Sequence, residues 1–294
     1  MALSPNIRGA LLMTGSMTAF TVNDGFMKVL SEAFPFFQLL LLRSVLTTTF
    51  IGLLAWQAGA LKAQVARGDW RLMLIRTIAE VGAAYFFLNA LFNMPIANVT
   101  AIIQALPLTV TLGAALVLKE PVGWRRFIAI GIGFLGVMLI VRPGGEGFSL
   151  YSVFALLAVL CVTVRDLAAR RLSSDVPSLF VALTAAIGVT IFSSIGALFV
   201  DWEPMNGRDL ALLGCAALAI IGGYLFSVMA MRVGEIGFVA PFRYSSLLAA
   251  LFLGLFVFGE WPDGWTQIGA IVVVTTGLFT LWRERRLARK PKPA

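Results

Sequence analysis

Charged side chains stand inside apolar stretches of this sequence, where they are well placed to bind an ion or a charged solute. Asp24, Arg43, Glu80, Arg165 and Arg243 each lie within or near the end of a long apolar segment. A charge inside a hydrocarbon layer is costly, so such residues are functional candidates by default. From the rise of a helix, Asp24 and Arg43 share one side of the layer, and Glu80 and Arg243 share the other. We therefore expect two ion pairs.

These charges allow two interpretations. A zwitterionic solute needs a cation for its carboxylate and an anion for its amino group. Asp24, Arg43, Glu80 and Arg165 are accordingly predicted to be gating or substrate-anchoring residues. The alternative is that the charges only neutralise one another and hold the helices together.

Uncharged polar residues at similar depth suggest a cavity between the helices. Tyr85 and Asn89 are four residues apart and share a helix face. Tyr224 follows two glycines, which allow close helix approach. The residues predicted to line a substrate cavity are Tyr85, Asn89, Gln104, Tyr224, Arg243 and Tyr244. The alternative is ordinary packing, with the tyrosine hydroxyl groups bonded between helices.

Two prolines fall inside apolar segments. Pro107 and Pro241 would each remove a backbone hydrogen bond from a helix and permit a kink. We predict that both are hinge residues.

The composition sets the class of protein to which these residues belong. The chain has 59% hydrophobic and only 13% charged residues, with a mean hydropathy of +0.90. A soluble domain has about a quarter of its residues charged, so a membrane protein is indicated. Histidine is absent, which removes the commonest general base and the commonest metal ligand. We predict no enzyme activity, no metal and no cofactor.

The apolar segments are long enough to cross a bilayer, which takes about 20 residues. The ten predicted spans are 7–30, 36–58, 72–94, 96–118, 124–141, 149–171, 177–200, 209–232, 237–259 and 264–282. Most Lys and Arg residues outside the spans fall on the side of the two termini, which predicts that both termini are cytoplasmic. The net charge of +8 is explained by this bias, and no basic patch indicates nucleic-acid binding.

The chain is internally duplicated. Lys119-Glu120-Pro121-Val122-Gly123-Trp124 is echoed by Gly259-Glu260-Trp261-Pro262-Asp263-Gly264-Trp265. Matches at offsets of 140 to 142 run through the whole half: Asp24 and Asp166, Lys28 and Arg170, Pro35 and Pro177, Val99 and Val239, Glu120 and Glu260, Trp124 and Trp265. Since each half has five spans, an odd number, the second half is predicted to be inverted relative to the first.

The predicted units are residues 1–142 for the first repeat, 143–282 for the second repeat and 283–294 for a basic cytoplasmic tail. Glu120 and Glu260 are each expected to cap the N-terminus of the helix that follows, where negative charge is favourable. The fold class expected is an all-α membrane protein of ten transmembrane helices in two inverted five-helix repeats.

With this motif and this duplication, the chain resembles the drug/metabolite transporter superfamily and its EamA family, most nearly the YddG-type exporters. The resemblance implies a secondary transporter that exports aromatic and other apolar amino acids and related small metabolites by alternating access. It also implies a multi-pass protein of the bacterial inner membrane. The partners expected are a small-molecule substrate and the lipid bilayer, with the monomer as the working unit.

Other functions remain open at this point. The substrates could instead be other small metabolites, drugs or nucleotide-type solutes. A membrane channel or receptor is the further alternative. A channel would more often show a re-entrant filter or oligomeric symmetry, whereas this chain carries both halves itself.

Overall fold

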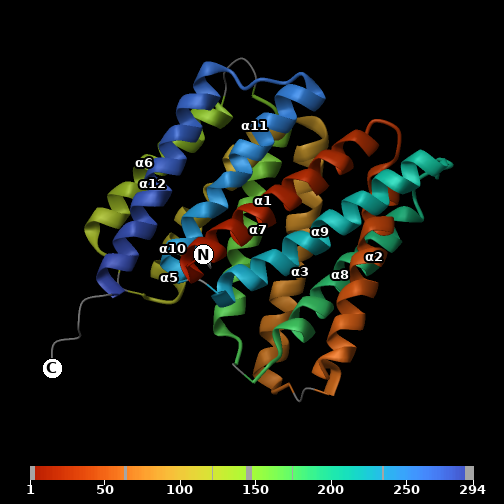
Figure 1. Ribbon diagram of the computed structural model, residues 1–294, viewed down its shortest axis with the longest axis horizontal. Helices are drawn as coiled ribbons and strands as arrows, with labels where there is room; N and C mark the ends of the chain where they lie inside the picture. The colour runs from red at the N-terminus through yellow and green to blue at the C-terminus, as the bar shows by residue number, and fades with distance from the viewer. Residues whose placement is uncertain are drawn as a thin grey trace.

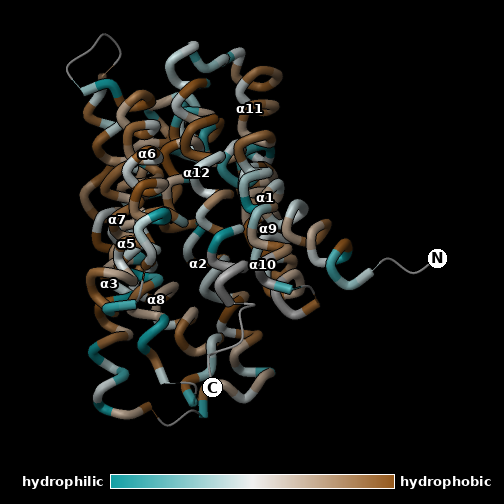
Figure 2. Tube along the Cα trace, turned by 90° about the vertical axis from the view of Figure 1, so that its left-hand side faces the viewer, coloured by the Kyte–Doolittle hydropathy of each residue, from teal (hydrophilic) through white to brown (hydrophobic). Residues whose placement is uncertain are grey.

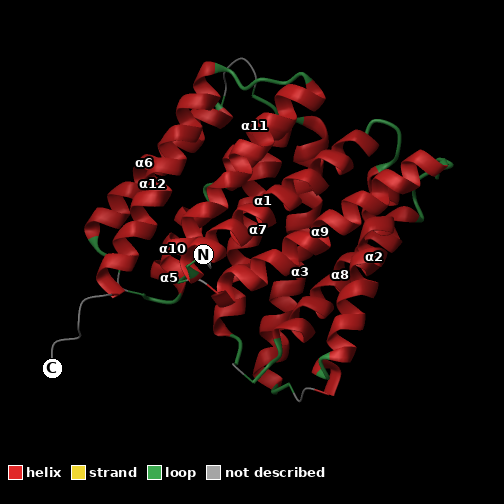
Figure 3. Ribbon diagram, viewed as in Figure 1, coloured by secondary structure: helices red, strands yellow, loops and turns green. Residues whose placement is uncertain are grey.

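The computed structural model describes residues 4–62, 65–120, 122–143, 148–173, 175–233 and 235–288. Within these ranges all regular structure is helical (Figure 3). The helices are α1 (Pro5–Leu30), α2 (Phe36–Gln57), η1 (Ala60–Lys62), α3 (Arg67–Asn93), α4 (Ile96–Ile103), α5 (Leu106–Val117), α6 (Trp124–Val141), α7 (Leu150–Arg171), α8 (Ser178–Ala197), α9 (Gly207–Val233), α10 (Ile236–Val239), η2 (Ala240–Tyr244), α11 (Ser245–Phe258) and α12 (Gly264–Ala288).

The predicted all-α membrane fold is confirmed. Among the described residues, nine helical segments are long and apolar enough to cross a membrane, and α1, with 26 residues, is a further long helix. Figure 2 shows apolar residues along most of the helices, with hydrophilic stretches mainly at the loops. Helix α12 continues to Ala288, so the predicted tail begins as helix, while residues 289–294 lie outside the described part.

The helices pack across the two halves in an inverted arrangement (Figure 1). Helix α1 packs along α9, and its equivalent α7 packs along α3. The pairs α2 with α8 and α6 with α12 each join equivalent helices of the two halves. The first helix of each half thus packs on the third helix of the other, as expected for inverted repeats.

Two equivalent spans are interrupted. Helices α4 and α5 are separated by Gln104 and Ala105, and Pro107 lies in the first turn of α5. In the other half, η2 separates α10 from α11, with Pro241 in its first turn. Proline cannot donate the helical hydrogen bond, which explains why both spans break near it. Both spans are interrupted beside the prolines that were expected to permit kinks, and the use of these prolines as hinges stays a prediction.

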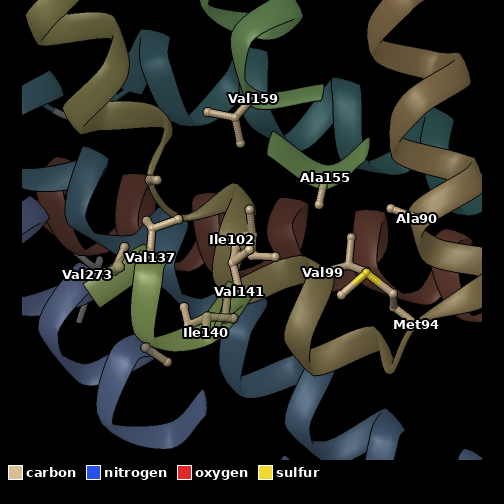
Figure 4. Packing of buried hydrophobic residues seen from close by; sticks show 13 residues of the cluster. Ala90, Met94, Val99, Ile102, Val137, Ile140, Val141, Ala155, Val159 and Val273 are labelled. Atoms are coloured by element: carbon tan, nitrogen blue, oxygen red, sulfur yellow. The ribbon is translucent and has the colours of Figure 1, made fainter. Parts of the chain in front are cut away.

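A buried core surrounds the first interruption (Figure 4). It joins five helices, α3, α4, α6, α7 and α12, through Ala90, Val99, Ile102, Val137, Ile140, Val141, Ala155, Val159 and Val273. Helices α6 and α12 approach so closely that a Cβ on Gly136 would lie 3.0 Å from the Gly269 carbonyl oxygen. Glycine is therefore needed at this crossing.

The duplicated motif forms the same turn in both halves. Lys119 and Gly259 both adopt the left-handed region, with φ of +56° and +64°. The next amide then donates back into the preceding helix: Glu120 to Ala114 at 3.2 Å and Glu260 to Gly254 at 2.7 Å. Pro121 lies outside the described residues.

The expectation that these glutamates cap the following helices is wrong. Glu260 accepts from the Ile96 amide at 3.1 Å, at the start of α4 in the other half. Asp263 caps α12 instead, by accepting from the Thr266 amide at 2.8 Å. In the first half, Gly123 is the N-cap of α6 and no side chain bonds there.

Candidate functional site

A network of charges lies between α3 and α7, in the interior of the bundle. Arg165 Nη1 lies 3.3 Å from Glu80 Oε1 and 3.4 Å from Glu80 Oε2. Its Nε donates to Asp166 Oδ1 at 2.9 Å. Arg76, one turn before Glu80 on α3, reaches the same carboxylate at 4.0 Å and donates to the Val181 carbonyl at 3.2 Å. Both acids in this network are therefore neutralised by nearby arginines.

The predicted pairing of Glu80 with Arg243 is wrong. Glu80 faces α7 because α3 packs along α7, and its partner is Arg165. Arg243 lies in η2 with an exposed side chain, and within the described ranges it forms no ion pair. Similar depth in the layer was not enough to identify the partner.

Asp24 and Arg43 are neighbours without direct contact. Asp24 Oδ1 accepts from the Asn23 side-chain amide at 2.9 Å. Among the residues that the structure describes, Arg43 has no carboxylate within 4.0 Å and no side-chain hydrogen bond. Asp24 nevertheless interacts electrostatically with Arg43, as do Tyr224 and Glu80. The expected contact pair is absent, while the electrostatic coupling is present.

Tyr224 on α9 lies near Arg43 and the charges between α3 and α7. Its phenol interacts electrostatically with Glu80, Arg165 and Arg43, which come from α3, α7 and α2. The ring meets Phe20 of α1 edge-on, with centroids 5.2 Å apart. Tyr224 is nevertheless 45% exposed. Tyr224 thus combines an exposed ring with a phenol near the charges of three other helices. Asp24, Arg43 and Tyr224 are called the central group below.

Tyr85 lies in a cluster of aromatic rings. Its ring centroid is 5.5 Å from that of Phe36, 6.0 Å from Phe192 and 6.3 Å from Phe154. These rings come from α2, α8 and α7, and the first two contacts are edge-to-face. Asn89, one turn further along α3, donates to the Tyr85 carbonyl at 2.8 Å, so its amide group is engaged with its own helix.

Gln104 and Tyr244 meet at the interrupted spans. Gln104 Nε2 donates to Ser246 Oγ at 2.9 Å and lies 3.5 Å from the Tyr244 carbonyl oxygen. The Tyr244 ring packs against Gly277, where a Cβ would collide with the phenol. Its buried hydroxyl has no hydrogen-bond partner among the described residues. Both residues therefore connect the two halves at their equivalent breaks.

The residues predicted to line one substrate cavity lie in separate places in the structure. Tyr224 joins the central group, Tyr85 and Asn89 lie beside the aromatic cluster, and Gln104 and Tyr244 lie at the breaks. Arg76, which falls near the start of the predicted span 72–94, was not singled out from the sequence. Because α3 begins at Arg67 rather than near residue 72, Arg76 lies deeper than expected. Its spacing of four residues from Glu80 was the available signal.

Comparison with known proteins identifies the family to which the chain belongs. The model of the EamA-like transporter family matches residues 7–142 and again residues 149–282. A riboflavin transporter of Vibrio cholerae is 30% identical over 225 residues, which cover 75% of this chain and 74% of that protein. An S-adenosylmethionine uptake transporter of Rickettsia prowazekii is 25% identical over 194 residues, 65% of each chain.

A solved crystal structure shares the fold with a TM-score of 0.61. The match covers 97% of this chain and 99% of the other at 18% sequence identity, so it supports the fold alone. The family match, repeated once in each half, covers far more than half of the sequence. The chain is a multi-pass membrane transporter that belongs to the EamA-like transporter family.

Proposed function

We propose that this transporter carries small metabolites that bear an α-amino-acid group, by alternating access between the two sides of a membrane. The observation that carries the proposal is the central group. It offers a cation, an anion and an exposed tyrosine, and among the described residues neither charge is in contact with an opposite charge.

An amino-acid group is the complement of these charges. A guanidinium binds a carboxylate through two parallel hydrogen bonds, so Arg43 is the group for the substrate carboxylate. Asp24 accepts one hydrogen bond from Asn23 and keeps acceptor sites for an ammonium group. Tyr224 adds a hydroxyl from the other half of the chain. The substrate thereby offsets the cost of holding these charges in the layer.

The interrupted spans support alternating access. Pro107 and Pro241 lie beside equivalent breaks, and Gln104 links those breaks across the two halves. A few such residues can absorb the backbone changes of a rocking motion. Since one chain contains both repeats, the proposed working unit is the monomer.

The names of relatives bear on the choice of solute. S-adenosylmethionine, named for the Rickettsia prowazekii protein, carries an α-amino-acid group, as do the aromatic amino acids that the resemblance predicts. Export, rather than uptake, is part of the proposal, as is a bacterial inner membrane with both termini cytoplasmic. The excess of Lys and Arg on the side of the termini supports that orientation.

The test is counterflow in proteoliposomes. Vesicles loaded with unlabelled solute are given radiolabelled phenylalanine, tryptophan or S-adenosylmethionine at trace concentration. We expect saturable accumulation in the native protein and loss of at least about tenfold in Arg43→Gln, because a charge-assisted hydrogen bond contributes about 1.5–3 kcal/mol. Transport by Arg208→Gln should be unchanged, because Arg208 lies exposed at the start of α9.

Two outcomes would overturn the proposal. One is the absence of counterflow for every solute with an amino-acid group. The other is equal transport by Arg43→Gln and Arg208→Gln. Repeating the assay with an imposed pH gradient separates proton-coupled transport from facilitated diffusion.

A second candidate solute is a flavin. Two observations favour it: the Tyr85 ring cluster, which suits a planar ring system, and the 30% identity to a riboflavin transporter. In this case riboflavin should enter the vesicles, as followed by its fluorescence, and Tyr85→Leu should reduce the rate of riboflavin uptake. Phe252→Leu is the matched control, because Phe252 is 62% exposed and lies on α11, away from the cluster. Riboflavin transport that is insensitive to Tyr85→Leu would exclude this site.

A further inference from the structure

Lys28 is locked in place at the end of the bundle opposite the termini. Its Nζ lies 3.0 Å from Glu260 Oε1 and also donates to the Met94 carbonyl. The ammonium lies over the Phe258 ring, 5.3 Å from its centroid. The side chains of Lys28 and Glu260 are only 10% and 27% exposed. The contact joins α1 of the first half to the α11–α12 connection of the second.

Glu260 also closes this end through the backbone of α4. Its Oε2 accepts from the Ile96 amide at 3.1 Å, at the first residue of that helix. Helix N-termini favour negative charge, so Glu260 is stabilised by both a cation and a helix end. One carboxylate thus ties together α1, α4 and α11.

The equivalent ion pair at the other end is longer and more exposed. Arg170 is the counterpart of Lys28 at an offset of 142, and Glu120 is the counterpart of Glu260 at 140. Arg170 Nη1 lies 3.6 Å from Glu120 Oε1, and the two side chains are 47% and 49% exposed. Arg170 is the ion-pair partner of Glu120 among the residues described. The same pair of positions is therefore tight at one end and loose at the other.

We infer that Lys28–Glu260 and Arg170–Glu120 are two alternating gates, each of which tightens when the other loosens. The inference rests on the proposed alternating access. In an inverted repeat, the second state of the carrier is reached when each half adopts the conformation of the other. Glu120 then engages the first turn of α10 as Glu260 now engages α4, while Lys28 and Glu260 separate. The present structure is the state closed at the end opposite the termini.

The two gates also differ in sequence, and the difference affects their strength. The position of Phe258 is occupied by Leu118 in the first repeat, so Arg170 has no equivalent ring to lie over. A cation over an aromatic face gains about 0.5–1 kcal/mol or more when it is desolvated. The Lys28 gate should therefore be the stronger one, and the state seen here the more populated one without substrate.

Chemical crosslinking tests the gates. In a Cys161→Ser/Cys215→Ser background, Lys28→Cys/Glu260→Cys forms one pair and Arg170→Cys/Glu120→Cys the other. A short bifunctional methanethiosulfonate reagent joins each pair, and reductant releases it. We expect either crosslink to stop transport reversibly. In a variant with all four cysteines, closing the first pair should slow crosslinking of the second by at least tenfold.

Arg142→Cys/Asp263→Cys is the matched control, because this ion pair lies at the same end as Lys28 but joins α6 to α12, which pack along each other. Its crosslink should leave transport intact. The inference is overturned if the two gates crosslink independently or if their crosslinks leave transport unchanged. Crosslinking rates are read from electrophoretic mobility and need no substrate, so a wrong substrate would not be mistaken for failure of the gates.

A conservative variant guards against simple loss of folding. Lys28→Glu places two like charges at the gate and should abolish transport, whereas Lys28→Arg keeps a cation beside Glu260 and should retain a substantial fraction of it. If Lys28→Arg is as inactive as Lys28→Glu while both fold, an ion-pair gate at this end is excluded.

Discussion

Asn23–Asp24 on α1 and Arg165–Asp166 on α7 occupy equivalent positions of the two repeats, 142 residues apart. In each pair the first side chain donates to Oδ1 of the aspartate that follows, at 2.9 Å in both halves. Arg165 also brings a positive charge and reaches Glu80 on α3. Asn23 brings none, and its side-chain oxygen has no hydrogen-bond partner among the described residues.

The comparison shows that equivalent aspartates have different partners in the two repeats. On α7 the arginine satisfies two acids and ties α7 to α3, which is a structural role. On α1 the asparagine orients Asp24 without neutralising it, so the carboxylate remains available to a cationic group. Arg43, the cation that interacts electrostatically with Asp24, has no counterpart, because Ala185 stands at the equivalent position and is buried. The proposed site arises where the two repeats differ.

The largest effect is expected from Arg165→Gln. Among the described residues, removing this cation leaves Glu80 with Arg76 alone, 4.0 Å away, and leaves Asp166 with no cation in contact. Breaking a largely buried ion pair from one side costs about 3–5 kcal/mol. Unfolding in mixed micelles should show a loss near the lower end of this range. The double variant Arg165→Gln/Glu80→Gln should recover part of it, and unchanged stability in the single variant would contradict the structural role.

Asp24→Asn should differ from Arg165→Gln, because it should retain stability and reduce transport. The amide retains the shape of the carboxylate and removes a charge that no cation contacts, so stability should be unchanged or raised. Counterflow of amino-acid solutes should fall about tenfold, because a hydrogen bond to a charged group contributes about 1.5–3 kcal/mol. Transport of riboflavin, which has no ammonium group, should be much less affected. A loss of stability as large as that of Arg165→Gln would mean that the two aspartates play the same part.

Asn23→Arg makes the first repeat resemble the second. The new guanidinium should pair with Asp24 and compete with the substrate ammonium, so counterflow should fall by a few-fold, less than when the carboxylate is lost. Stability should fall by about 1–3 kcal/mol, because Asn23 is only 2% exposed and the longer side chain must be accommodated in a packed site. Asn23→Gln, with no charge, is the control. Native transport rates in Asn23→Arg would contradict the proposed role of a free Asp24.

The fold was predictable because its signals are repeated along the chain. Ten apolar segments, and matched residues that always lie 140 to 142 positions apart, were enough to predict the inverted halves. Pro107 and Pro241 indicated where equivalent spans are interrupted. These features depend on local sequence and on chain symmetry, and neither requires knowledge of which helices are neighbours.

The partners of individual charges could not be predicted in the same way. Depth along a helix suggested Glu80 with Arg243, but the partner is Arg165, because α3 packs along α7. Glu260 was expected to act on the helix that follows it, but it contacts α4, from the other half. Pairing between distant segments depends on helix packing and rotation, which a sequence without an alignment does not reveal.

The smallest effect concerns another position where the repeats differ, the N-termini of α6 and α12. Gly123 offers no side chain to α6, whereas Asp263 caps α12 and pairs with Arg142. Burial alone would raise the pKa of Asp263, but hydrogen bonds from Thr266 and the Arg142 guanidinium outweigh it, so its pKa lies below the ordinary value. A carboxyl group whose pKa is lowered by folding stabilises the protein above its unfolded pKa, about 3.9. That contribution is lost as the pH falls through the folded pKa.

Asp263→Asn should therefore lower the free energy of unfolding by about 0.5–1 kcal/mol at pH 7, the range of a helix cap and an exposed ion pair. The difference from the native protein should shrink as the pH is lowered below about 4 and through the lower folded pKa of Asp263. Unfolding midpoints measured in an acid-stable detergent at pH 7 and at the acidic end would show this convergence. An equal difference at both pH values would mean that the shape of the side chain, rather than its charge, stabilises α12, and that the two repeats differ here only in packing.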